Sequence, residues 1–168
     1  MVLIAKLLVL ALTAAATPIF RRDAVTVEND ITQKIGPQIQ TLDSDVNGFP
    51  ASGSSGALAI HNDLQSLVPL VDGATSDIKL TGSFSEADGA TILEEVQSLT
   101  SKLLASDWEN ITGGQARVSS DLQSLNKSFD GFTNALVIAE TLLQAPSVLG
   151  VRIQIGSAFA DAIAAYSN

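Results

Sequence analysis

The sequence predicts an all-α protein, an antiparallel bundle of about five amphipathic helices. Apolar residues recur at intervals of three and four through most of the chain, which is the period of one face of an α-helix. Short segments rich in Gly, Pro, Ser and Asn separate these periodic stretches, as expected of connections. The alternating apolar pattern of a half-buried strand does not occur beyond the N-terminal 22 residues. Helices joined by short connections bury their apolar faces against one another, which favours a bundle.

The first two predicted helices both contain proline. Apolar residues spaced through residues 27–49 predict the first helix. We expect it to bend at Gly36-Pro37, because proline has no N–H to donate within a helix. Apolar residues spaced through residues 60–78 predict the second helix, in which Pro69 is expected to cause a bend.

The third and fourth predicted helices have clearer signals. The third opens at Ser85, and Asp88 three residues later resembles a capping box. The fourth has the clearest apolar stripe, with spacings of four and three along seven turns, and Gly131 within it predicts a close contact or a kink. The stripe consists of Val118, Leu122, Leu125, Phe129, Phe132, Leu136, Ala139 and Leu143.

The last predicted helix runs through the apolar residues between Val148 and Tyr166. It is expected to begin after Pro146, with Ser147 as its N-cap, because serine accepts a hydrogen bond from the free N–H groups of the first turn. Glycine-rich or proline-rich segments separate the helices at residues 47–50, 52–56, 81–83 and 113–114.

The first 22 residues have the layout of a secretory signal peptide. Lys6 is followed by an apolar run and then by the small residues Ala14, Ala15 and Ala16, the usual order of a signal peptide and its cleavage site. The apolar run is shorter than the roughly 20 residues of a membrane-spanning helix. The pair Arg21-Arg22 follows at once and fits a processing site. We therefore predict a leader at residues 1–22 and a single secreted helical-bundle domain at residues 23–168, with no transmembrane segment.

Composition excludes several classes of function. The chain carries 9 basic and 18 acidic residues, and Lys6, Arg21 and Arg22 belong to the leader, so the mature charge is 6 minus 18, or −12. Nucleic acids and anionic membranes both require a basic surface, which argues against either as a partner. With no cysteine and a single histidine, disulfides and metal sites built from several Cys or His ligands are impossible. We expect no cofactor and no metal.

The residues that could carry catalysis do not form a recognisable site. The sequence has no Gly-x-Ser-x-Gly elbow, no His-Glu-x-x-His motif and no phosphate-binding glycine loop. His61 and Asp63 would point about 200° apart on a helix, so they make no dyad, and His61 is expected on a helix surface. Adjacent Glu94 and Glu95 also diverge and are expected on a solvated face. The sequence therefore predicts that the protein is not an enzyme.

The apolar residues exceed what one narrow stripe on each helix requires. Two explanations remain open: a thicker core or a dimer face, or a cavity or groove for an aliphatic ligand between the helices. The residues beyond the stripes are Leu58, Val68, Leu70, Leu93, Leu104, Val137, Ile138, Leu142, Leu149, Ile153 and Ile163.

Several features together resemble the fungal hydrophobic surface-binding protein A family, also described as cell-wall galactomannoproteins. They are the leader, the cysteine-free helical chain, the opening pattern Ile31, Ile35, Leu42-Asp43, Val46 and Phe49, and the ending at residues 159–166. The resemblance implies a secreted or wall-associated non-enzymatic bundle that adsorbs to hydrophobic surfaces, and some relatives bind fatty acids in an apolar interior. A lipid-anchored wall form is not expected, because neither a Ser/Thr-rich stalk nor a hydrophobic C-terminal tail is present.

We therefore predict a secreted or cell-wall protein that binds a long-chain fatty acid or similar lipid between its second, third, fourth and fifth helices. Gln65 or Ser124 is predicted to hold the carboxylate. The predicted apolar lining comprises Leu64, Leu67, Val71, Ile92, Val96, Leu99, Leu125, Phe129, Phe132, Leu136, Ile155 and Phe159.

Two alternatives accompany this prediction. The protein could adsorb to hydrophobic surfaces by partial opening of the bundle and recruit a secreted hydrolase, or it could be a structural cell-wall mannoprotein. Asn110 and Asn126 each begin an Asn-x-Ser/Thr motif and are the predicted glycan acceptors in a secreted chain.

Overall fold

A computed structural model describes residues 24–49, 51–105 and 115–165, and throughout these ranges the regular structure is helical. Residues 24–29, the π-helix η1 (Asp30–Ile35) and α2 (Gly36–Gly48) follow one another without a break and form the first helix. The other helices are α3 (Gly53–Thr81), α4 (Glu86–Ala105), α5 (Gln115–Ala139) and α6 (Ala145–Ala165). The described residues thus confirm the predicted all-α class.

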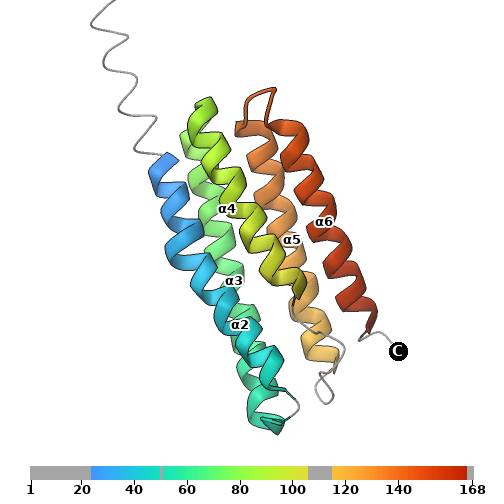
Figure 1. The fold of residues 1–168 in the computed structure, drawn as a ribbon. Coiled ribbons are helices and arrows are strands. Elements are labelled where there is room, and N and C mark those ends of the chain that lie inside the picture. The colour runs from blue at the N-terminus through green and yellow to red at the C-terminus, as the bar shows by residue number, and fades with distance from the viewer. Residues whose placement is uncertain (1–23, 50, 106–114, 166–168) are drawn as a thin grey trace, which may run out of the picture.

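The helices run up and down in antiparallel order (Figure 1). The first helix packs against α3 and α4, α3 packs against α5, α5 against α6, and α6 against α4. These contacts close a ring of five helices around a common core. Helix α4 completes the ring by packing against the first helix on one side and α6 on the other.

The first helix changes its hydrogen-bonding pattern where a bend was predicted. The Gly36 N–H donates to the Ile31 carbonyl, five residues earlier, which is the spacing of a π-helix. Pro37 follows as the second residue of α2. Because proline lacks an N–H and crowds the carbonyl four residues before it, the wider π turn lets the helix continue. A π-helical segment therefore lies directly before Gly36-Pro37, where the sequence predicts a bend.

The start of α4 confirms the predicted cap. The Asp88 N–H donates to Ser85 Oγ at 3.2 Å, and Ser85 Oγ donates to Asp88 Oδ2 at 2.7 Å. The predicted start of the last helix is wrong: α6 begins at Ala145 and includes Pro146 and Ser147 in its first turn. Proline is tolerated there because the first N–H groups of a helix have no intrahelical acceptor.

The predicted apolar stripe of α5 is buried from Val118 to Ala139. Leu143 is an exception, with 74% of its surface exposed, because α5 ends at Ala139 and the helical period no longer applies beyond it. Gly131 makes no close contact: a methyl group added there would have no heavy atom of a neighbouring element within 4 Å.

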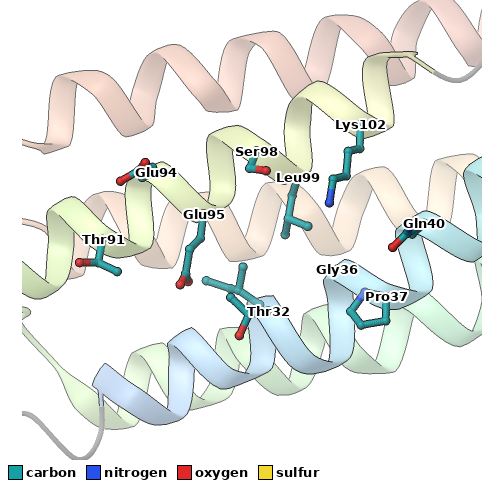
Figure 2. A pocket seen from close by; sticks show the side chains of 11 residues that line it. Thr32, Gly36, Pro37, Gln40, Thr91, Glu94, Glu95, Ser98, Leu99 and Lys102 are labelled. Atoms are coloured by element: carbon teal, nitrogen blue, oxygen red, sulfur yellow. The ribbon is translucent and has the colours of Figure 1, made fainter.

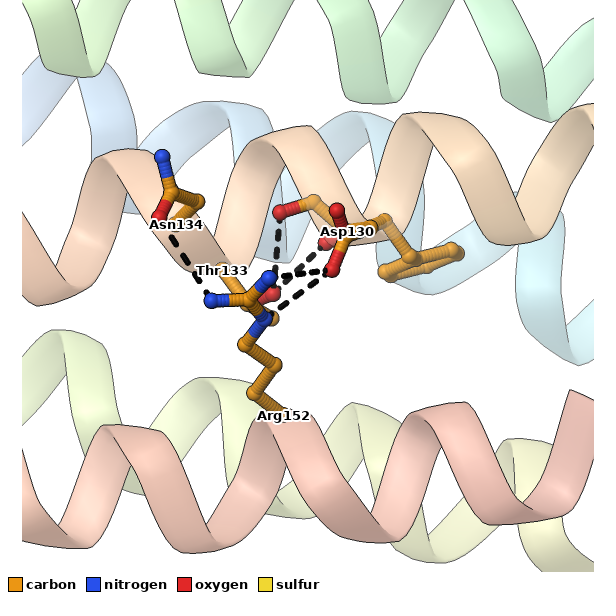
Figure 3. A network of polar contacts seen from close by, with 5 residues as sticks. Asp130, Thr133, Asn134 and Arg152 are labelled. Atoms are coloured by element: carbon orange, nitrogen blue, oxygen red, sulfur yellow. Dashed lines mark hydrogen bonds and ion pairs between the residues drawn. The ribbon is translucent and has the colours of Figure 1, made fainter.

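Helix α6 is joined to α5 by both apolar and polar contacts. The Phe129 ring lies 5.8 Å from that of Phe159 between ring centres. Arg152 donates through Nε to Asp130 Oδ1 at 2.9 Å, and its Nη1 lies 3.5 Å from Asn134 Oδ1 (Figure 3). Judged by length and composition alone, residues 145–164 of this helix are long and apolar enough to cross a membrane. The sequence analysis predicts no transmembrane segment. In the bundle, the face of α6 that contains Phe159 packs into the core.

Candidate functional site

A cleft opens between the first helix and α4 (Figure 2). Its volume is about 490 Å³, within the roughly 300–1,000 Å³ of small-molecule pockets. Along α4 it extends from Thr91 to Lys102, about 16 Å at 1.5 Å per residue. Its lining consists of Ile31, Thr32, Gly36, Pro37, Gln40, Thr91, Glu94, Glu95, Ser98, Leu99 and Lys102.

The apolar part of the cleft lies around Gly36. A methyl group added at this glycine would lie 3.5 Å from Leu99 Cδ2 and 3.1 Å from the Ile31 carbonyl oxygen. Ile31 and Leu99 are themselves buried. A methyl group at position 36 would thus make an ordinary van der Waals contact with α4, whereas its tight contact would be with the Ile31 carbonyl of the first helix itself. Ile31, Pro37 and Leu99 form the apolar lining of the cleft.

The polar part of the cleft contains several hydrogen-bond donors. Gln40 contributes an amide, Ser98 a hydroxyl and Lys102 an ammonium group. Figure 2 shows the Lys102 side chain extending from α4 toward the first helix near Gly36 and Pro37. This end of the cleft can therefore donate hydrogen bonds to an anionic group.

Glu95 occupies the other part of the cleft and was predicted to be solvated. Its side chain points from α4 toward Thr32 of η1 (Figure 2). Burial, with a smaller contribution from the charges of Glu28 and Glu94, raises the pKa of Glu95 to about 7. Its Oε2 is buried and accepts no hydrogen bond from the described residues. The sequence reasoning missed this group because its surroundings come from another helix.

The structure brings all twelve predicted lining residues into the core. Each is buried, and they lie on α3, α4, α5 and α6 as predicted. Only Leu99 also lines the cleft. Ile92 and Val96 of α4 face the core instead, and the predicted set contained no residue of the first helix. Contact of the other eleven with a ligand stays a prediction. The Gly36-Pro37 pair was the available sequence signal for the first-helix side of the cleft.

The two side chains predicted to hold a carboxylate lie away from the cleft. Gln65 is exposed on α3. Ser124 is exposed on α5, where its Oγ donates to the Ser120 carbonyl at 3.0 Å. It lines a second pocket of about 420 Å³ between α3 and α5, which also contains Lys79 and Lys127. Both therefore lie apart from Gln40, Ser98 and Lys102, the donors that line the first-helix cleft.

His61 is half-buried and bonded across the bundle. Its Nδ1 lies 2.5 Å from Asp121 Oδ2, which joins α3 to α5. The sequence correctly gave no dyad with Asp63, but it did not anticipate a partner 60 residues away. Among the described residues no group of three or more His, Cys, Asp and Glu side chains could hold a metal ion.

Four exposed aliphatic side chains lie near one end of the bundle, and we call them together the apolar tip. Helices α3 and α5 both end there, and the Phe84 N–H joins them by donating to the Ala139 carbonyl at 2.9 Å. Ile138 lies beside Lys79 and Gly82 in a shallow hollow at this end. The apolar tip consists of the exposed residues Leu80, Ile138, Leu142 and Leu143.

Of the two predicted glycan acceptors, Asn126 is half-buried in α5. Asn110 and the predicted leader at residues 1–22 lie outside the described residues.

Comparison with known proteins bears on the predicted resemblance. The family described as hydrophobic surface binding protein A matches residues 24–106. The matched segment is just under half of the chain, and it confirms the predicted resemblance to the hydrophobic surface binding protein A family. No match is found among curated proteins.

Solved structures share the fold. A crystal structure of AFMP4P in complex with palmitic acid has 28% sequence identity and a TM-score of 0.79, covering 86% of this chain and 99% of that one. Ligand binding domain 1 of the Penicillium marneffei MP1 protein, complexed with arachidonic acids, has 15% identity and a TM-score of 0.77, with coverage of 86% and 99%.

The segment matched by the hydrophobic surface binding protein A family contains the whole cleft. Every lining residue falls between Ile31 and Lys102, inside residues 24–106. In contrast, Ile138, Leu142 and Leu143 of the apolar tip lie beyond this segment.

Proposed function

We propose that the protein binds a long-chain fatty acid through the cleft between the first helix and α4. The observation that carries this proposal is the likeness to AFMP4P in complex with palmitic acid, at 28% identity over 86% of this chain and 99% of that one. A cleft of about 490 Å³ inside the family-matched segment gives the ligand a place in this chain.

The acyl chain would enter beside Ile31 and Leu99 and follow the inner face of α4. Ile92 and Val96 on that face are buried toward the core, and the acyl chain would have to displace α4 outward to contact them. Each CH₂ group transferred from water contributes about 0.8 kcal/mol. A long saturated tail therefore supplies most of the binding free energy.

The carboxylate would lie at the donor end of the cleft, near Lys102, Gln40 and Ser98. Hydrogen bonds in which one partner is charged are roughly twice as strong as neutral ones. These groups bind and orient the headgroup, and the role we propose is binding without catalysis.

A rim substitution tests this proposal. Ser98 is exposed and lines the cleft, whereas its neighbour Gln97 is exposed and does not. Delipidated protein is titrated with a fluorescent C16 fatty acid. We expect Ser98→Trp to fill the cleft and raise Kd at least about tenfold, while Gln97→Trp binds like the wild type. Absence of saturable binding by the wild type, or equal effects of the two variants, would contradict the proposal.

A second function, adsorption to hydrophobic surfaces, is favoured by the apolar tip. Four large aliphatic side chains are exposed at one end of the bundle, and exposed apolar patches mark interaction sites. Adsorption to alkyl-coated beads that persists with saturating fatty acid would separate this function from lipid binding. Recruitment of a secreted hydrolase stays a prediction, to be tested by co-adsorption on the same beads.

We propose further that the protein is exported and resides outside the cell or in the cell wall. The leader-like residues 1–22 and the sequons at Asn110 and Asn126 support this proposal. N-terminal sequencing of protein from culture medium and from wall fractions tests the cleavage. Intact mass before and after endoglycosidase treatment tests the glycans, and their presence without lipid or surface binding would favour a structural mannoprotein.

A further inference from the structure

Glu95 is the half-buried acid of the cleft. It lies one position after Glu94, which lines the same cleft but is exposed. The Glu95 carboxyl reaches toward the first helix (Figure 2), and its Oε2 lacks a hydrogen-bond partner among the described residues. A buried polar atom of this kind costs free energy unless a ligand or a proton compensates it. The arrangement therefore points to a group that acts when the cleft is occupied.

The charges around Glu95 are mostly negative. The first helix contributes Glu28, and α4 contributes Glu94, both of which disfavour an ionised Glu95. The cation in the cleft, Lys102, is two helical turns away on the same side of α4, or about 10 Å along the axis. The other cleft-facing first-helix residues are uncharged.

The remaining neighbours do not change this balance. Lys34 of the first helix is paired with Asp30. Helix α6, on the other side of α4, has Arg152 and Asp161 as its charged residues, and Arg152 pairs with Asp130 of α5. An ionised Glu95 therefore adds a further negative charge to an acidic end of the cleft.

We propose that the protonation state of Glu95 decides whether the cleft accepts an anionic headgroup. This inference rests on the proposed binding of a fatty acid. When Glu95 is protonated, it adds no negative charge to the cleft in which Lys102 attracts the fatty-acid carboxylate. When Glu95 is ionised, its charge repels the ligand carboxylate through the same half-buried cleft. Glu95 is thus a specificity-determining residue that makes binding of anionic lipids pH-dependent.

The range of pH follows from the same surroundings. Burial, Glu28 and Glu94 raise the pKa of Glu95 to about 7, whereas an ordinary carboxyl has a pKa near 4.3. Between pH 5.5 and pH 8 the ligand in solution behaves as an anion while Glu95 changes from mostly neutral to mostly charged. Binding should therefore weaken as the pH rises. A neutral lipid of the same chain length should show no such change.

The experiment compares palmitate with hexadecanol at pH 5.5 and pH 8. Delipidated wild-type protein is titrated beside Glu95→Gln, which resembles the protonated form, and Glu94→Gln, a matched control on the neighbouring exposed residue. Circular dichroism at both pH values checks that each variant is folded. Palmitate addition is also followed by the carboxyl ¹³C chemical shift of Glu95, which reports its titration directly.

We expect the wild-type Kd for palmitate to rise about tenfold from pH 5.5 to pH 8, because the protonated fraction of a carboxyl with a pKa of about 7 falls about tenfold over this range. Glu95→Gln should bind palmitate equally at both values, and Glu94→Gln should keep most of the pH dependence. Bound palmitate should also raise the pKa of Glu95, because the coupling is reciprocal.

Three results would overturn the inference: a pH-independent wild type, a dependence that persists in Glu95→Gln, or the same dependence with hexadecanol. Each leaves fatty-acid binding itself intact. If neither palmitate nor hexadecanol binds at either pH value, the proposed function itself is contradicted. This outcome differs from the three above, in which lipid binding is still observed.

Discussion

The carboxyl group of Glu140 lies against the α-carbon of Gly89. A methyl group placed on Gly89 would come within 2.1 Å of Glu140 Oε2 and 2.9 Å of its Cδ. Gly89 is in the first turn and a half of α4, and Glu140 directly follows α5. Neither carboxyl oxygen of Glu140 has a hydrogen-bond partner in the described part of the chain. Burial raises the pKa of Glu140 to about 7, although the nearby backbone N–H of Thr141 favours the ionised form and partly opposes this rise.

This raised pKa predicts that Glu140→Gln stabilises the fold at neutral and alkaline pH. In the wild type, the folded state holds the proton more tightly than the unfolded state, whose glutamate has a pKa near 4.5. The stabilising effect of the proton is present below pH 4.5 and is lost as the pH rises through 7. At pH 8 the amide should raise the free energy of unfolding by about 1–3 kcal/mol, and at pH 4 the difference should nearly vanish.

Urea unfolding at pH 4 and pH 8 measures this difference. Glu86→Gln is a suitable control, because Glu86 is exposed in the first turn of α4. Its charge interacts favourably with the helix dipole, so its loss should cost about 0.3–1 kcal/mol at pH 8. An equal gain from Glu140→Gln at both pH values would contradict the titration argument.

A pair of glycine substitutions tests the packing of the first helix. Gly131 is inside α5 with open space around it, so Gly131→Ala should stabilise by about 0.5–1 kcal/mol through helix propensity. Gly36→Ala brings the same gain in propensity but places its methyl 3.1 Å from the Ile31 carbonyl oxygen. We expect it to be less stabilising than Gly131→Ala or destabilising. Thermal melts would contradict this if both variants gained equally.

The contact between His61 and Asp121 predicts strong coupling between α3 and α5. His61→Leu leaves a nearly buried carboxylate without its partner, which should cost about 1–3 kcal/mol. The double variant His61→Leu/Asp121→Leu should recover most of this loss, because both polar groups are then removed. A double-mutant cycle measured by urea unfolding gives the interaction energy. Additive effects of the two substitutions would rule out the coupling.

The successes of the sequence analysis concern local patterns. The apolar stripe of α5 predicted its buried face correctly up to Ala139, because helical period alone sets which side faces a core. Ser85 was identified as a cap because its hydrogen bond is made to Asp88, three residues away. Contacts between residues this close in the sequence can be predicted from the local sequence alone.

The misses concern the ends of elements and contacts between them. Leu143 continued the spacing of the stripe, but a period does not say where a helix ends. The sequence predicts that the last helix begins after Pro146, but α6 begins at Ala145. Proline is tolerated in the first turn because an N–H at that position has no acceptor within the helix.

The cleft illustrates the larger gap. Ile31 of the first helix and Leu99 of α4 line the same cleft, and Glu95 is half-buried where the first helix faces α4. These relationships depend on the packing order of helices separated by about 60 residues. The sequence correctly predicted which residues form the apolar interior. It could not show that the first helix packs against α4, and the cleft and its polar groups depend on that packing.

The apolar tip predicts that adsorption to hydrophobic surfaces can be reduced without harming the fold. Leu142 is 95% exposed and Leu143 is 74% exposed, so replacing both by serine removes almost no buried surface. We expect a change in unfolding free energy within about 0.5 kcal/mol. Each leucine buried against an oily surface contributes up to about 1.5–3 kcal/mol, so adsorption to alkyl-coated beads should weaken at least tenfold.

Leu58→Ser provides the matched control for this variant. Leu58 is also exposed, but it lies near the start of α3, at the end of the bundle opposite Leu80. If the apolar tip is the adsorbing surface, Leu58→Ser should adsorb like the wild type, and both variants should retain fatty-acid binding because the cleft is untouched. Equal losses in the two variants would instead indicate adsorption through any exposed leucine, or through general opening of the bundle, since neither mechanism depends on one end of the molecule.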